Sequence, residues 1–242
     1  MTPEIFAWES DTLGCKTELR RWGWYGRPVL FFPTTGGAAD ELERFGMVQA
    51  LKPLIEGGRI KLYGLGSPAA ERLTDRDLDG KSKSELCYQL DTFVVNEVVP
   101  RIEADCEDTE ERFVAAGIAT GAHQAVNTVA KHPDRFDVAI GLSGTYDFDR
   151  WMEDYFDENY YFNQPIRFVP HLEGEALEEV QSALFVLASG TGRWEDPEQT
   201  RRMAGVLQGK HIPVSLELWG EDAEHDWSTW RTMLPLFLDR LL

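Results

Sequence analysis

Val114-Ala-Ala-Gly-Ile-Ala-Thr-Gly-Ala-His123 carries the features that decide the fold. It starts inside Phe113–Ala116, an apolar run with the length of a buried strand, and continues into residues whose apolar side chains recur at helical spacing. Gly117 and Gly121 lie between the two, where glycine allows the backbone to approach its neighbours closely. The stretch therefore predicts a strand, a tight turn and a helix that closes at His132-Pro133.

The same alternation of short apolar runs and helical patterns extends along the chain in both directions. The other runs that we predict as strands are Pro28–Phe32, Arg59–Tyr63, Val138–Leu142, Ala183–Leu187 and Val214–Leu218. Helical spacing occurs over 42–55, over 86–98 with an end near Pro100 or one turn beyond, over 122–129 and over 230–241. This alternation predicts an α/β fold, a mostly parallel sheet with helices on both faces, in a single domain over 1–242. Ligands of such sheets bind at the carboxyl ends of the strands.

Composition and charge exclude several functions. The 242 residues include 42 acidic and 24 basic side chains, and the net charge of -18 repels nucleic acids and anionic membranes, so we expect neither as a partner. The N-terminal residues do not have the pattern of a secretion signal, no apolar stretch reaches the ~20 residues of a membrane span, and the three cysteines lack metal-ligand spacing. We expect a cytoplasmic protein without a bound metal. Without a Walker loop, H-E-x-x-H or G-x-G-x-x-G, we also expect no cofactor.

The turn Gly117-Ile-Ala-Thr-Gly121 has the spacing of a nucleophile elbow, G-x-S-x-G, in which a serine lies on a strained strand-to-helix turn. Ala119 is at the serine position. The spacing alone is weak evidence, because Gly205 and Gly209 supply a second pair of glycines four residues apart. The strand before the turn and the helix after it favour the elbow, and a plain tight turn is the alternative.

A loop of small residues, Thr34–Gly37, follows the Pro28–Phe32 strand. The backbone N–H groups of Thr35 and Gly36 are candidates for one half of an oxyanion hole, the set of donors that stabilises a tetrahedral intermediate. The N–H of Thr120, next to the nucleophile position, is the candidate for the other half. A generic turn is the alternative interpretation of this loop.

An acidic residue and a histidine follow the last two predicted strands. Glu195 and Asp196 lie in the loop after Ala183–Leu187, and His225 lies in the loop after Val214–Leu218. A general-base histidine needs a carboxylate that fixes its tautomer and stabilises its protonated form. Either acid could serve His225, and a solvated loop side chain is the alternative for the histidine.

Together these segments resemble a known family. In chain order the matching stretches are Phe32–Gly37 with Phe45–Met47, Gly117–Ala122, His132–Phe136, Leu142–Asp147, Tyr161–Pro165, Gly192–Asp196 and His225–Trp230. They resemble the bacterial esterase branch of the α/β-hydrolases, relatives of esterase D (S-formylglutathione hydrolase), feruloyl esterases and mycolyltransferases. The resemblance covers nearly the whole chain and implies an eight-stranded sheet. It also implies a Ser-His-acid triad at position 119, His225 and either Glu195 or Asp196, and Ala119 departs from that pattern.

Alanine at position 119 changes what the chain can do. A methyl group cannot attack a carbonyl carbon, so the route through a covalent acyl-enzyme is closed. We do not expect Thr120 or His123 to replace the nucleophile, and His225 remains as a base that could activate water. We therefore expect an esterase-like α/β-hydrolase of carboxylic-ester type that is inactive or nearly so, by an engineered Ser→Ala change or as a natural pseudoenzyme. The alternative is a non-catalytic module that binds a ligand or a protein with the same fold.

An aromatic-rich segment around 146–172 follows the fourth predicted strand, where α/β-hydrolases place a cap over the active site. We expect Trp151, Tyr155 and Tyr161 of this segment, with Trp227 of the histidine loop, to line a pocket for a small-molecule ester or acyl ligand. The alternative is that these rings pack the segment onto the domain. The sequence leaves the oligomeric state open, with a homo-oligomer among the alternatives.

Overall fold

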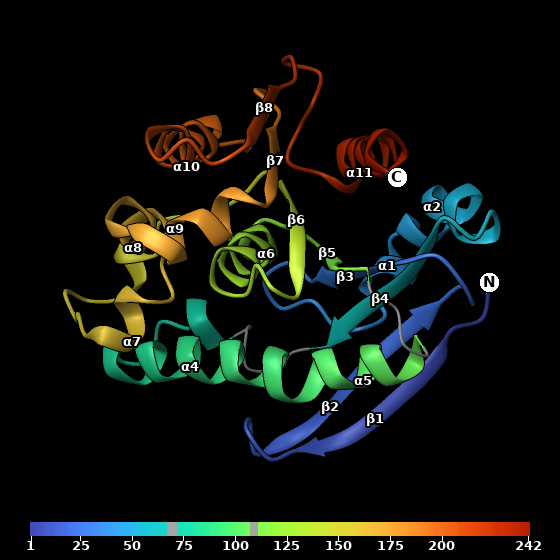
Figure 1. Ribbon diagram of the computed structural model, residues 1–242, viewed down its shortest axis with the longest axis horizontal. Helices are drawn as coiled ribbons and strands as arrows, with labels where there is room; N and C mark the ends of the chain where they lie inside the picture. The colour runs from blue at the N-terminus through green and yellow to red at the C-terminus, as the bar shows by residue number, and fades with distance from the viewer. Residues whose placement is uncertain (67–71, 107–110) are drawn as a thin grey trace.

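An eight-stranded sheet forms the centre of the molecule (Figure 1). The computed structural model describes residues 1–66, 72–106 and 111–242, and all of these strands lie within them. They are β1 (Glu4–Ser10), β2 (Cys15–Trp22), β3 (Arg27–Phe32), β4 (Ile60–Gly66), β5 (Phe113–Ile118), β6 (Phe136–Leu142), β7 (Leu184–Ser189) and β8 (Val214–Leu218). The order is β1-β2-β4-β3-β5-β6-β7-β8, and β3 to β8 run parallel. The predicted fold class, a mostly parallel eight-stranded sheet, is confirmed.

Two strands that apolar runs did not reveal, β1 and β2, form an antiparallel hairpin at one edge of the sheet. Along β1, Phe6 and Trp8 pack against the core, whereas their neighbours Ala7 and Glu9 are exposed. A strand with one solvated face carries alternating rather than continuous apolar residues. For this reason only the family resemblance implied these two strands.

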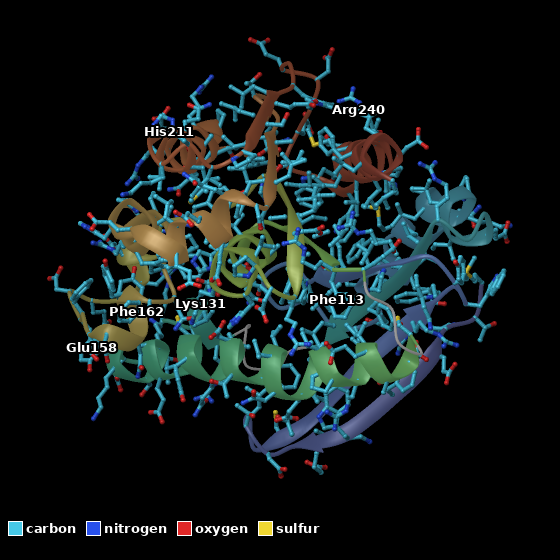
Figure 2. The ribbon with its side chains drawn as sticks, viewed as in Figure 1. Phe113, Lys131, Glu158, Phe162, His211 and Arg240 are labelled. Atoms are coloured by element: carbon cyan, nitrogen blue, oxygen red, sulfur yellow. The ribbon has the colours of Figure 1, made fainter. Side chains whose placement is uncertain are left out.

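Helices cover both faces of the sheet, as predicted. One face carries α1 (Glu41–Arg44), α2 (Met47–Glu56) and α11 (Trp227–Leu241), and the other carries α4 (Gly80–Phe93), α5 (Val99–Asp105), α6 (Thr120–Lys131), α9 (Gly174–Gln181) and α10 (Pro197–Gly209) (Figure 1). Side chains fill the space between the sheet and these two layers (Figure 2). In the parts of the chain that the structure describes, no helix combines the length and the apolar character that crossing a membrane requires.

The segment between β6 and α9 contains only short elements and packs on α4 and α6. These elements are η3 (Asp149–Trp151), α7 (Glu158–Tyr161), α8 (Pro165–Phe168) and η4 (Val169–His171), and another short turn, η1 (Arg72–Thr74), precedes α4. Lys83 of α4 donates a hydrogen bond of 2.8 Å to the backbone oxygen of Trp151. Lys131 of α6, labelled in Figure 2, donates one of 2.9 Å to Asn163 Oδ1. Polar contacts at Trp151 and Asn163 therefore hold the segment to the two helices.

The helix that we predicted over 42–55 is two helices. Gly46 adopts φ 75° between α1 and α2, a conformation that suits glycine, and it turns the chain. Phe45, just before it, stacks on Trp227 of α11 with ring centroids 4.8 Å apart. The helical spacing of apolar residues did not reveal this break, because the spacing carries no information about the backbone at Gly46 or about the contact with α11.

The long helix predicted over 86–98 starts earlier, at Gly80, and continues to Asp105, about one turn beyond Pro100. Between α4 and α5 it passes through a π-helical turn, η2 (Val94–Val98). Proline has no N–H to donate to the carbonyl four residues back, and its ring crowds that carbonyl. The wider turn just before Pro100 relieves this conflict and lets the helix continue.

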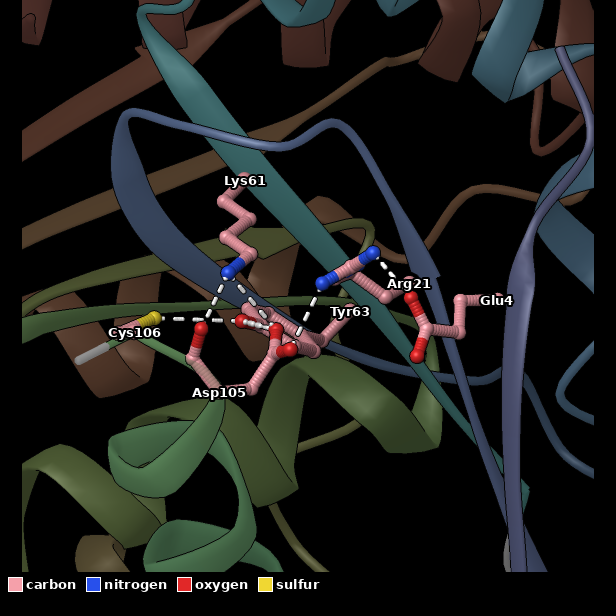
Figure 3. A network of polar contacts seen from close by, with 6 residues as sticks. All are labelled: Glu4, Arg21, Lys61, Tyr63, Asp105 and Cys106. Atoms are coloured by element: carbon pink, nitrogen blue, oxygen red, sulfur yellow. Dashed lines mark hydrogen bonds and ion pairs between the residues drawn. The ribbon is translucent and has the colours of Figure 1, made fainter.

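Asp105, the last residue of α5, ties this helix to the sheet (Figure 3). Its carboxylate accepts hydrogen bonds from Arg21 Nη1 at 2.7 Å and Tyr63 Oη at 2.6 Å, and Lys61 Nζ lies 2.8 Å from it. Burial would raise the pKa of Asp105, but the hydrogen bonds from Lys61 and Tyr63 hold it below its ordinary value. One ionised carboxylate thus joins β2, β4 and α5.

Glu97 makes a similar connection between η2 and the N-terminal hairpin. Its carboxylate accepts hydrogen bonds from Trp8 Nε1 at 2.6 Å, Ser10 Oγ at 2.8 Å and the Thr12 N–H at 2.9 Å. Burial by itself would raise the pKa of Glu97, yet these three donors together lower it to about 2. The ionised carboxylate therefore stabilises the folded state.

Glu97→Gln is expected to lower the free energy of unfolding at pH 7 by about 2 kcal/mol, since a charge-assisted acceptor of three donors is lost. The depressed pKa means that this stabilisation is complete above the unfolded pKa of ordinary glutamate and disappears as the pH falls toward about 2. Urea unfolding of the two proteins across this pH range measures the difference. Glu9→Gln on the exposed side of β1 is the control, and an equal loss in both variants would contradict the assignment.

Candidate active site

The turn between β5 and α6 holds Ala119 in an unusual backbone conformation. Its φ is 54° and its ψ is -114°, a region that residues with a side chain rarely occupy and that costs about 1–3 kcal/mol. Two hydrogen bonds hold it there: the Ala119 N–H donates to the Leu142 carbonyl at 3.0 Å, and the Thr145 N–H donates to the Ala119 carbonyl at 3.1 Å. Both partners lie at or just after the end of β6, so the neighbouring strand maintains the strain. This geometry favours the elbow over a plain turn.

Gly117 and Gly121 are required by the same turn. A Cβ on Gly117 would overlap the backbone oxygen of Gly121, and a Cβ on Gly121 would overlap the carbonyl oxygens of Phe32 and Pro33. The end of β3 and the start of α6 therefore touch backbone to backbone. A Cβ on Gly205 of α10 would meet nothing within 4 Å, which identifies the second glycine pair as a coincidence of composition.

Gly121→Ala is expected to destabilise the fold by roughly 3 kcal/mol, because the added methyl must displace backbone atoms rather than a flexible side chain. The matched change Gly205→Ala, on an exposed helical position, is expected to stabilise by up to about 1 kcal/mol. Thermal or urea unfolding of both variants measures the two effects. A Gly121→Ala protein as stable as the parent would show that β3 and α6 are not in this close contact.

Glu195 and His225 form a pair at the carboxyl ends of β7 and β8. His225 Nδ1 lies 3.2 Å from Glu195 Oε2, and the Glu195 side chain is only 1% exposed. The carboxylate also accepts hydrogen bonds from Ser143 Oγ at 2.6 Å, Ser189 Oγ at 3.1 Å and the Gly190 N–H at 3.3 Å. Burial would raise the pKa of Glu195, but the contacts with His225 and Ser143 keep it below the ordinary value. A buried, ionised acceptor at Nδ1 places the proton there and leaves Nε2 free to act as a base.

Glu195 and Asp196, the two candidate acids of the sequence, lie in opposite surroundings. Glu195 points to His225, whereas Asp196 is exposed and occupies the position before α10. Ser143 and Trp230 complete the surroundings of the pair: Trp230 Nε1 donates to Ser143 Oγ at 2.9 Å, and its ring lies edge-on to His225 with centroids 4.9 Å apart. Sequence reasoning gave these two residues no role. They lie in matching segments of the resemblance, but serine and tryptophan near a strand end have many other uses.

The two halves of the predicted oxyanion hole are in contact. Thr35 Oγ1 and Thr120 Oγ1 are 3.0 Å apart, so the loop after β3 reaches the first residue of α6. The Gly37 N–H donates to the Thr34 carbonyl at 2.8 Å and closes a turn in which Gly36 has φ 75°. The first N–H groups of a helix have no partner inside it, so that of Thr120 is available to an oxygen held beside residue 119.

Of the predicted pocket residues, Trp227 lies near the pair, since its ring is edge-on to Trp230, 5.5 Å away. Tyr161 lines a cavity with Ala130 and Lys131, at the end of α6 opposite the elbow. The 12 residues of α6 separate the two ends of the helix by about 18 Å.

Trp151 and Tyr155 pack within the insertion and against α4. Trp151 is edge-on to Phe148, and Tyr155 Oη donates to Asp157 at 3.0 Å. These positions favour the packing alternative for the three rings of the insertion. His123 is also packed, with its ring stacked on Phe148 at 4.2 Å, and burial lowers its pKa to about 4.

Residues 1–66, 72–106 and 111–242 contain no cluster of three or more His, Cys, Asp or Glu side chains arranged to hold a metal ion. The arrangement has the layout of an acyl-transfer site: a strained turn at the nucleophile position, which holds alanine here, a histidine oriented by a buried acid, and candidate backbone donors. With the strand order, this geometry defines an α/β-hydrolase.

The family model named Esterase, described as "Putative esterase", matches residues 66–238. The chain belongs to this esterase family, as the resemblance predicted. No curated protein matches the sequence.

Solved structures share the fold over essentially the whole chain. A ferulic acid esterase superposes with a TM-score of 0.75 at 15% identity, covering 100% of this chain and 99% of its own. An S-formylglutathione hydrolase from Staphylococcus aureus superposes with a TM-score of 0.69 at 11% identity, covering 99% and 95%. A ferulic acid esterase from Anaeromyces mucronatus, in complex with ferulic acid, gives 0.73 at 11% identity, covering 98% and 89%. At these identities the likeness establishes the fold.

Proposed function

We propose that this chain has the architecture of a carboxylic-ester hydrolase and binds an ester or acyl ligand. It turns this ligand over very slowly, because Ala119 occupies the nucleophile position. The observation that carries the proposal is the backbone of Ala119 at φ 54° and ψ -114°. An alanine gains nothing from this strained conformation, whereas a nucleophilic serine needs it. The Glu195–His225 pair is assembled at the carboxyl ends of β7 and β8, and its carboxylate is satisfied by hydrogen bonds.

The remaining residues have roles in this chemistry that follow from their positions. With serine at position 119, His225 Nε2 would accept the hydroxyl proton while Oγ attacks the ester carbonyl, and Glu195 would stabilise the protonated ring. The N–H groups of Thr35 and Thr120 would bind the oxyanion of the tetrahedral intermediate. With Ala119 the attack can only come from a water that His225 activates, and only a residual acceleration of about 10³–10⁴ over water is expected.

Two origins of Ala119 fit this proposal: an engineered Ser→Ala change in an active esterase, or a natural pseudoenzyme that retains the site for binding. The intact acid–histidine pair supports retained use of the site in either case. The residue at position 119 in the native gene separates them. The three free cysteines favour a reducing compartment, and the cytoplasm is the location that we propose.

Hydrolysis of p-nitrophenyl acetate and butyrate by the chain as written and by Ala119→Ser tests the proposal. Ala119 itself favours one second candidate, a non-catalytic module that binds a small-molecule or protein ligand. That candidate predicts a ligand bound equally by both forms, with neither form hydrolysing esters. A gain of hydrolysis in the serine form alone supports the esterase architecture.

A further inference from the structure

Glu41 is a buried carboxylate that the acid–histidine pair does not use. It is the first residue of α1 and is only 3% exposed. A carboxylate in such a place must be satisfied by hydrogen bonds. Both of the donors that we find come from one residue: the Thr34 N–H donates to Oε2 at 2.9 Å, and Thr34 Oγ1 donates to Oε1. Burial raises the pKa of Glu41, and these two hydrogen bonds oppose the rise.

The loop after β3 wraps around this carboxylate. A Cβ on Gly37 would lie 2.5 Å from Glu41 Oε2 and 2.7 Å from Oε1, so the Gly37 backbone rests directly on the carboxylate. Two successive turns close the loop, with the Gly37 N–H donating to the Thr34 carbonyl at 2.8 Å and the Glu41 N–H donating to the Ala38 carbonyl at 2.9 Å. Of the two ends of the predicted oxyanion loop, Thr34 is therefore hydrogen-bonded to Glu41 and Gly37 packs against the same carboxylate.

The position of this loop determines where its N–H groups lie relative to residue 119. Thr35 follows Thr34 directly and contacts Thr120 through the two hydroxyl groups, 3.0 Å apart. Oxyanion donors act because they are held in place before the reaction, and removing one costs about 10²–10³ in kcat. A displacement of about 1 Å in such a site costs up to about 10².

We propose that Glu41 is a positioning residue that holds the Thr34–Gly37 loop in place as one half of the oxyanion hole. The proposal rests on the proposed function, because an oxyanion has to form for the loop to matter in catalysis. Glu43, two residues further along α1, provides a matched control: it is exposed and pairs with Arg20 at 3.3 Å on the surface.

The kinetic test is made in the Ala119→Ser background. Glu41→Gln keeps the size of the side chain but replaces one of the two carboxylate oxygens with an NH2 group and removes the charge, so the loop is held less firmly. We expect kcat for p-nitrophenyl acetate to fall about tenfold while KM changes less than about twofold, because the donors act on the transition state. Glu43→Gln should leave both constants unchanged. Thr34→Val loses one of the two donors to Glu41 and should also lower kcat.

Amide hydrogen exchange provides a second test, made on the chain as written, where no nucleophile is needed. We expect Glu41→Gln to speed exchange at Thr34 and Gly37 about tenfold or more while α6 and the central strands keep their rates. If Ala119→Ser is inactive on all esters, the proposed function fails, and exchange still decides whether Glu41 fixes the loop.

Three results would overturn the proposal. The first is unchanged exchange in the loop, the second is faster exchange throughout the chain, which would mean general destabilisation, and the third is an active Ala119→Ser enzyme in which Glu41→Gln leaves kcat unaltered. Local loosening of the loop together with a kcat-specific loss supports it.

Discussion

Ala119→Ser is expected to raise the rate of p-nitrophenyl ester hydrolysis by at least about 10³-fold over the chain as written. Loss of the nucleophile from a working triad costs about 10⁶ in kcat, and the remaining site retains a small part of the acceleration. The strained backbone that a serine needs is already present, because hydrogen bonds to Leu142 and Thr145 maintain it independently of the side chain at 119. On the proposed function, a hydroxyl is the catalytic group that the alanine form lacks.

Ala119→Gly is the matched control for this experiment. It leaves the site without a nucleophile and relaxes a positive φ, so its activity should remain at the background of the alanine form. Initial rates with purified proteins, checked for equal folding by circular dichroism, measure the difference. If the serine form hydrolyses esters no faster than the glycine form, the assignment of position 119 as the nucleophile position is wrong.

Glu195→Gln, made in the Ala119→Ser protein, is expected to lower kcat by about 10⁴-fold. Glutamine retains the shape of the side chain, but it can turn its amide N–H toward His225 Nδ1 and so favour the wrong tautomer, in which Nε2 carries the proton and is no longer a base. The carboxylate is almost fully buried, so water cannot take its place as the acceptor of the His225 proton. The change acts on the base and on the stabilisation of the protonated ring, so the loss should appear in kcat.

Asp196→Asn is the control, since Asp196 is the neighbouring acid and is exposed. It should change kcat less than about twofold. Thermal unfolding of both variants shows whether each is folded at the assay temperature, because Glu195→Gln also disturbs acceptors of Ser143 and Ser189. Equal losses in the two variants, or a small loss at Glu195, would contradict the assignment of the acid.

The sequence predicted the central part of the sheet because buried parallel strands appear as short apolar runs. The β1–β2 hairpin lacks such runs, and the break at Gly46 occurs next to a ring contact between Phe45 and the distant Trp227. Short apolar runs and helical spacing reveal neither a half-exposed edge strand nor a contact between distant segments. Tertiary contacts accompany both features.

For the candidate site, the sequence indicated which loops to consider but not always which residue of a loop. Chain order led us to expect Ala119 and His225 at the same edge of the sheet, since the carboxyl ends of parallel strands meet there. Glu195 and Asp196 are adjacent in sequence, yet one is enclosed and the other faces solvent, and only the three-dimensional path of the loop separates them. The aromatic rings of the insertion show the same limit, because composition does not reveal which surface a ring faces.

The hydrogen bonds from the end of β6 to Ala119 have an evolutionary consequence. The geometry of the elbow is specified by residues that a change at position 119 does not touch, so losing the hydroxyl leaves no structural trace around it. Alanine and serine codons of the form GCN and UCN differ by a single base. The alanine and serine forms of such a site are therefore one nucleotide step apart, and the same fold accommodates both.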